Sequence, residues 1–143
     1  MASGVYNDYK ARAFGDGTMV DLDGDTIKIA LLTSSYTPDF DAHDFYDDVS
    51  ANEVPASGTY AAGGATLTVA LSQDNTDDEG VFDASDVSFT SATITARYAV
   101  IYKSTGNSAT SPLICLIDFG SNQTSTAGTF TITFAAEGIL NLN

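Results

Sequence analysis

Apolar and polar residues alternate along most of the chain after residue 17, and this two-residue period predicts β-strands. The segment 129–134 alternates without interruption, so Phe130, Ile132 and Phe134 are expected to share one buried face. The segment 112–119 is apolar on both faces, as expected of a central strand. The main strands are predicted at 26–33, 66–71, 92–103, 112–119 and 129–134, with shorter ones at 81–82, 87–89 and 139–142.

The alternation also predicts which side chains point the same way, because successive residues of a strand face opposite sides of the sheet. Leu67, Val69 and Leu71 are expected on one face of the strand 66–71. The strand 26–33 is expected to be buried on one face and partly on the other. One face of the strand 92–103 is predicted to carry Ile94, Ala96, Tyr98, Val100 and Tyr102.

Turn-forming residues separate these predicted strands. Ser, Thr and Gly dominate 104–111 and 120–128, which are therefore expected to be loops. Gly63 and Gly64 predict a bend at the start of a strand, and a single helical turn is expected within 41–48. Short strands at regular intervals favour an all-β fold: a single antiparallel β-sandwich or barrel-like domain.

The first 16 residues are expected to form an N-terminal arm, followed by the β-sandwich domain over 17–143. Asn7 or Asp8 can cap a short helix in this arm, and Gly15 ends it. The pattern leaves open whether the arm packs on its own domain or reaches a neighbouring molecule. The arm carries the aromatic residues Tyr6, Tyr9 and Phe14 and the basic residues Lys10 and Arg12.

The composition fits one folded domain, because 143 residues with 43% hydrophobic residues can bury a substantial core. The charge is strongly negative: 19 acidic residues against five basic ones give a net charge of −14. A nucleic-acid binder needs a basic surface to neutralise phosphates, and an anionic membrane attracts the same kind of surface. The charge therefore argues against nucleic acid and membrane as partners.

Few residues could support nucleophilic catalysis. Cys115 is the single cysteine, so the chain has no intrachain disulfide, and it lies within an apolar predicted strand. His43, the single histidine, lies in an acidic segment far along the chain from Cys115. We therefore expect no enzymatic activity. The start of the chain lacks the basic and apolar regions of a signal peptide, so we expect synthesis in a cytoplasm.

Acidic residues gather in three places, and each is a candidate cation site, because hard cations favour oxygen ligands. The segment 21–25 begins like a calcium-binding loop, but Thr26 and Leu32 stand where that loop needs Gly and Glu. A tight turn before the next strand is the favoured interpretation. The other two clusters are favoured as solvated surface, so no cofactor or metal is predicted. They comprise Asp39, Asp41, Asp44, Asp47 and Asp48, and Asp74, Asp77, Asp78 and Glu79.

Read in order, the strand segments resemble a known family. The segment Ala-Arg-Tyr-Ala-Val-Ile-Tyr, at 96–102, is the most specific part, and the resemblance extends from about Asp21 to Leu142. That segment belongs to a longer similar stretch at 92–102, and the other similar segments are 27–38, 60–67, 81–87, 112–114, 117–120 and 128–132. The chain resembles small virion structural proteins of tailed bacteriophages, with Phe89 and Phe134 where relatives carry tryptophan.

This resemblance implies a capsid decoration, or cement, protein that binds the outer head surface and bridges capsomers. The implied partners are the major capsid protein and copies of the chain itself, arranged as a trimer at local three-fold positions. The implied location is the outer capsid surface of the virion. Aromatic residues and a basic spot on the arm would suit contact with an acidic shell. The candidate contact residues are Tyr6, Tyr9, Lys10, Arg12 and Phe14.

Two alternatives remain open from the sequence. A tail or neck component of the virion would use the same kind of β-sandwich. A carbohydrate-binding surface module could stack sugars on Tyr36, Tyr46 or Tyr60, with nearby acidic residues and Ca²⁺. Fold class alone does not separate these functions, because sandwiches carry many different binding sites.

Overall fold

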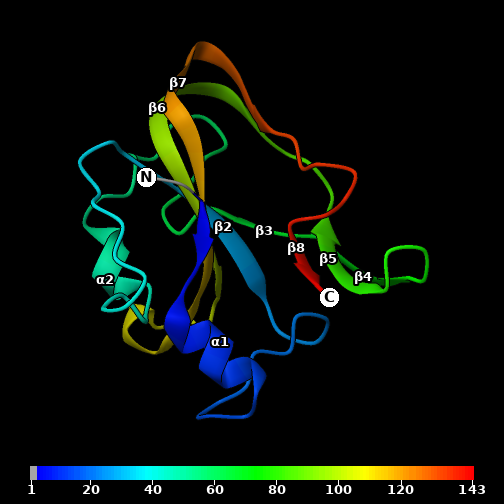
Figure 1. Ribbon diagram of the computed structural model, residues 1–143. Helices are drawn as coiled ribbons and strands as arrows, with labels where there is room; N and C mark the ends of the chain where they lie inside the picture. Colours follow the sequence, from blue (N-terminus) through cyan, green and yellow to red (C-terminus); the bar gives the residue numbers. More distant parts are fainter. Residues whose placement is uncertain (1–2) are drawn as a thin grey trace.

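The computed structural model describes residues 3–143, which form two packed antiparallel sheets and a short N-terminal helix. The strands are β1 (Gly4–Val5), β2 (Ile27–Leu32), β3 (Ala65–Thr66), β4 (Val69–Asp74), β5 (Glu79–Ala84), β6 (Val87–Lys103), β7 (Leu113–Ile132) and β8 (Leu140–Leu142). The helices are α1 (Asn7–Ala13), α2 (Asp47–Ser50) and the 3₁₀-helix η1 (Ser108–Thr110). One sheet has the order β1-β7-β6-β2-β3 and the other β4-β5-β8 (Figure 1). The predicted all-β, antiparallel fold is confirmed, and its two sheets are open and packed in a sandwich-like arrangement.

The five-stranded sheet is buried on both faces at β2, the second half of β6 and the first residues of β7. Ile27, Ile29 and Leu31 of β2 lie in the core that faces the three-stranded sheet. Ala30 and Leu32 point the other way, into a second core beneath the long connection between β2 and β3. Because apolar side chains are needed on both sides, β2 is an almost continuous apolar run, as in other doubly covered strands. The second core also contains Tyr6, Tyr36, Tyr46, Val49, Tyr98, Val100, Tyr102, Leu113 and Leu116.

Strands β6 and β7 form a long ribbon that includes a segment predicted to be a loop. The segment 120–128 was expected to be a loop, yet β7 runs without a break through it. Its Ser, Thr and Asn side chains are exposed on a strand rather than on a turn. The ribbon bends where Ser91 and Ala127 adopt positive φ angles of 52° and 45°. Near this bend, the Ser125 hydroxyl donates to the Ala92 carbonyl at 2.8 Å.

A β-bulge overturns the single face predicted for 92–103. The pairing of β6 with β7 shifts register between Ala96 and Tyr98. Between the pairs Ala96–Gln123 and Tyr98–Asp118, β6 advances by two residues and β7 by five. A shift by an odd number of residues moves the later side chains to the opposite face of the sheet. Ile94 and Ala96 therefore lie in the core between the sheets, whereas Tyr98 and Val100 lie in the second core.

The predicted strand 66–71 is divided between the two sheets. β3 pairs with β2 of the large sheet, whereas β4 pairs with β5 of the small one. The crossing is fixed by backbone hydrogen bonds on either side: the Leu67 amide donates to Ile27 at 2.8 Å, and the Ser85 amide donates to Thr68 at 3.0 Å. Alternation continues through the crossing, so the pattern cannot reveal that the chain changes sheets.

An ion pair across β6 and β7 is expected to make stability depend on pH in the acid range. Arg97 donates from Nε to Oδ1 of Asp118 at 2.7 Å and from Nη2 to Oδ2 at 3.2 Å. These bonds lower the pKa of Asp118 from 3.8 to about 2. Because the folded-state pKa is the lower one, the stabilisation is complete above 3.8 and is lost as the pH falls through about 2.

We therefore expect Asp118→Asn to be less stable than the parent protein at neutral pH, with the difference shrinking as the pH falls through this window. Urea unfolding curves at pH values above and below the window measure it. A difference that stays constant across the window would show that Asp118 stabilises the fold independently of its charge.

Candidate functional site

The predicted arm is joined to the large sheet, and this decides which of its aromatic residues can meet a partner. Gly4 and Val5 pair with Leu116 and Cys115 of β7, so β1 extends the sheet by one short strand. Tyr6 follows directly and is completely buried. Its hydroxyl shares a 3.0 Å hydrogen bond with that of Tyr36. Tyr6 was expected to be a surface anchor, but a partner cannot reach its side chain here.

The basic spot predicted on the arm is smaller than the sequence indicated. Arg12 donates from Nε to Asp8 at 2.5 Å, one helical turn away, and its Nη1 donates to the Thr18 carbonyl at 2.9 Å. Its charge is therefore matched within α1. Lys10 is exposed and donates to the neutral side-chain oxygen of Asn7 at 2.8 Å, which leaves its charge uncompensated by that contact.

Phe14, at the C-terminal end of α1, is the most exposed aromatic candidate. Its side chain is 95% exposed, whereas Tyr9 is half-buried against the core. The Phe14 amide donates to Ala11 at 3.0 Å, so the residue is held by the helix while its ring projects outward. Of the five predicted contact residues, Lys10 and Phe14 therefore offer their side chains most directly to a partner.

An apolar groove of about 560 Å³ lies between α1 and the three-stranded sheet. Tyr9, Lys10 and Phe14 line its helical side, while Leu71 and Leu142 line the sheet side. Leu71 is 48% exposed and Leu142 79% exposed. Among the described residues that line the groove, Lys10 is the one with a charge. The sequence pointed to Lys10 and Phe14 but missed both leucines, which appear in it as ordinary strand residues.

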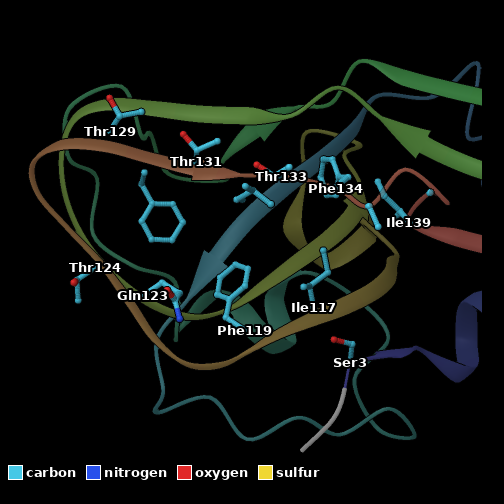
Figure 2. Close-up of a pocket in the computed structure, with 14 residues that line it drawn as sticks. Ser3, Ile117, Phe119, Gln123, Thr124, Thr129, Thr131, Thr133, Phe134 and Ile139 are labelled. Carbon is cyan, nitrogen blue, oxygen red and sulfur yellow. The ribbon is translucent and has the colours of Figure 1, made fainter.

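A second hollow of about 560 Å³ lies inside the bend of β7. Figure 2 shows Phe119 and Ile117 on one side of it and Phe134 on the other. Thr131 also borders the hollow, but its hydroxyl is bonded to Ser88 of β6 at 3.0 Å. The described lining contains hydroxyl and amide side chains but no acidic or basic residue that could activate them.

The two residues considered for nucleophilic chemistry are separated by the large sheet. Cys115 lies in the core between the sheets, where burial raises the pKa of its thiol to about 12. Such a thiol is protonated at neutral pH and is a poor nucleophile. His43 lies on the other side, where its Nδ1 shares a 2.8 Å hydrogen bond with the hydroxyl of Tyr36 in the second core.

The acidic segments mostly stabilise turns. Residues 21–25 form a turn, as favoured from the sequence: Asp21 Oδ1 accepts from the Asp23 and Gly24 amides at 3.1 and 3.0 Å. Asp25 forms a 2.8 Å ion pair with Lys103. In the first of the other clusters, Asp48 Oδ2 accepts from two backbone amides at 2.9 and 3.0 Å.

The turn between β4 and β5 brings three carboxylates together. Single oxygens of Asp74, Asp77 and Glu79 lie within 4.8 Å of one another. Asp74 accepts from the Thr76 and Asp77 amides, and Glu79 accepts from the Asn141 side chain at 2.6 Å. These bonds account for the local geometry of the turn, and the cluster gives the end of β4 a concentrated negative charge.

The tyrosines considered for sugar stacking are unavailable. Tyr36, Tyr46 and Tyr60 are 3%, 7% and 1% exposed. All three serve as core residues, because the long connection after β2 folds back over the sheet instead of lying open. A sugar cannot stack on rings that are covered in this way, so the carbohydrate module based on these residues is not supported.

Comparison with family models, curated proteins and solved structures finds no match to this chain. Within residues 3–143, no helix combines the length and the apolar character needed to cross a membrane.

Proposed function

We propose that this protein is a non-enzymatic structural component of a tailed-phage virion, and that it decorates the outer capsid surface and stabilises the shell. The observation that carries the proposal is the distribution of exposed apolar side chains. Among residues 3–143, three of the four large exposed apolar side chains, Phe14, Leu71 and Leu142, line the groove beside α1. Such a patch on a surface of net charge −14 favours assembly with other proteins.

Two further features support a structural role. The central part of the five-stranded sheet is covered by a hydrophobic core on each face, as a rigid unit requires. The thiol of Cys115 is buried and protonated at neutral pH, so it is a poor nucleophile. A cement protein needs rigidity and adhesive surface rather than chemistry, and many identical copies on one lattice make modest contacts effective.

The proposal predicts a high copy number in the virion. Quantitative mass spectrometry of purified particles should find this chain at about one copy per major capsid protein, as a lattice-wide decoration requires. Adding the purified protein to particles that lack it should raise their melting temperature. A few copies per particle would instead indicate a tail or neck position, and absence from the particle would refute a virion role.

A further inference from the structure

The groove beside α1 has two sides of opposite charge. Its helical side carries Lys10. Its other side is formed by β4, β5 and β8, whose connecting turn carries the acidic group Asp74, Asp77 and Glu79. Figure 1 shows α1 and the β4–β5 turn well apart, with the C-terminus between them. The groove therefore has a basic residue on its helical side and an apolar middle. The acidic turn lies just beyond its sheet side, because Asp74 and Glu79 are within two residues of Ser72 and Gly80, which line the groove.

The apolar middle exposes surface that a lone molecule would leave in water. Phe14 and Leu142 are 95% and 79% exposed, and Leu71 is 48% exposed. Burying apolar side chains of this size is favourable, and contiguous apolar patches mark interaction surfaces. The shape of the groove alone does not identify the occupant, but the charges on its two sides do.

Basic residues are scarce on this protein, so Lys10 is a distinctive charge on the surface beside the groove. Only five of the 143 residues are basic. Arg12, Arg97 and Lys103 are already paired with carboxylates of their own chain, at 2.5, 2.7 and 2.8 Å. On the opposite side of the groove, three carboxylates crowd within 4.8 Å and would gain from an added positive charge. The positive charge of Lys10 therefore complements the negative charge of the β4–β5 turn, and a second copy of the chain could bring the two together.

A two-fold axis through the middle of the groove satisfies both sides at once. Such an axis places the same surface of two copies face to face, so each basic side meets an acidic side. We propose that the groove binds a second copy of this chain as a symmetric dimer. In this dimer Lys10 of one copy faces the β4–β5 turn of the other, and Phe14 packs against Leu71 and Leu142 of the other copy.

This inference uses the same groove that supports assembly in the capsid proposal and assigns it to a second copy of the chain, so the unit that decorates a shell would be the dimer. It assigns Lys10 and Phe14 to the contact between copies, so a shell would be bound through another surface. The two proposals can therefore fail separately: copy number in virions tests one, and the mass of the purified protein in solution tests the other.

The first test is sedimentation equilibrium of the purified full chain across a dilution series. We expect a mass of twice 14.9 kDa at high concentration. Phe14→Asp should weaken the association about a hundredfold, because it places a charge at the centre of an apolar contact. Met19→Asp is the matched control: Met19 is 58% exposed and does not line the groove, so this variant should still form the dimer.

The second test exchanges the charges. Lys10→Asp should weaken the dimer about tenfold, because it sets like charges against each other, and the double variant Lys10→Asp with Asp77→Lys should restore it. Both residues are exposed, so folding should be preserved, and circular dichroism checks it. A monomer at every concentration, a trimer, or a double variant as weak as Lys10→Asp would overturn the symmetric dimer.

Discussion

Gly64→Ala is expected to lower the free energy of unfolding by about 4 kcal/mol, because two separate effects act at this position. Gly64 has a φ angle of +76°, which residues with a Cβ atom rarely adopt. A Cβ atom there would also overlap the Ile29 carbonyl and lie 2.8 Å from Ala30 Cα. Neither contact is with a flexible side chain, so the backbone of β2 or β3 would have to move. Urea unfolding followed by circular dichroism measures the loss.

Gly106→Ala separates the two effects. Gly106 has a similar φ angle of +85°, but a Cβ atom there would meet nothing within 4 Å. This variant should lose only the conformational contribution, about 1 kcal/mol. Equal losses in the two variants would show that the close approach of Gly64 to β2 contributes nothing to the stability of the fold.

The bend at Gly63 and Gly64 illustrates what the sequence could predict. Two adjacent glycines indicated a bend before a strand, and β3 does begin at Ala65. The reason for the bend, the contact with the backbone of Ile29, joins segments 35 residues apart and has no local signal. Local patterns also located other strands: nearly continuous apolar runs indicated β2 and the first part of β7, and alternation indicated its last part.

Two predictions failed because strand pairing, which the local sequence does not reveal, determined the structure. In β6, one bulge at Ala96–Tyr98 reversed the faces of the residues that follow, although the apolar pattern continued unchanged. In β7, polar residues at 120–128 have the composition of a loop but lie on an exposed strand. A polar composition indicates that a segment is exposed to solvent, but it does not distinguish a loop from an exposed strand.

The candidate site was predictable in part. The sequence singled out Lys10 and Phe14, because basic and aromatic residues are conspicuous in an acidic chain. Tyr6 was singled out for the same reason. However, β1 pairs with β7, and the ring of Tyr6, the next residue, lies in the second core. Leu71 and Leu142 were missed, because a leucine in an alternating strand indicates burial. Their exposure follows from the short three-stranded sheet, which leaves one end of its apolar face uncovered.

Tyr60→Phe is expected to destabilise the protein by about 3 kcal/mol, although it removes a single oxygen. The Tyr60 hydroxyl accepts from the Leu31 amide at 2.9 Å and donates to Glu53 Oε1 at 2.7 Å. Leu31 is completely buried, so its amide would lose a partner in a place without water. Glu53 would keep the Gly63 amide as a donor, at 2.6 Å. The ring itself and its edge contact with Phe89 would remain.

Tyr46→Phe provides the matched control in the same core. Tyr46 is 7% exposed and stacks on Tyr102 with ring centroids 4.2 Å apart. Its hydroxyl lies near Glu53 but is buried without a hydrogen-bond partner. Removing it should change the unfolding free energy by less than about 0.5 kcal/mol or raise it slightly, since an unpaired buried hydroxyl is itself unfavourable. Guanidinium unfolding of both variants makes the comparison. If Tyr46→Phe costs as much as Tyr60→Phe, the two hydroxyls contribute equally, and the bonds of Tyr60 to Leu31 and Glu53 are not what stabilises this part of the core.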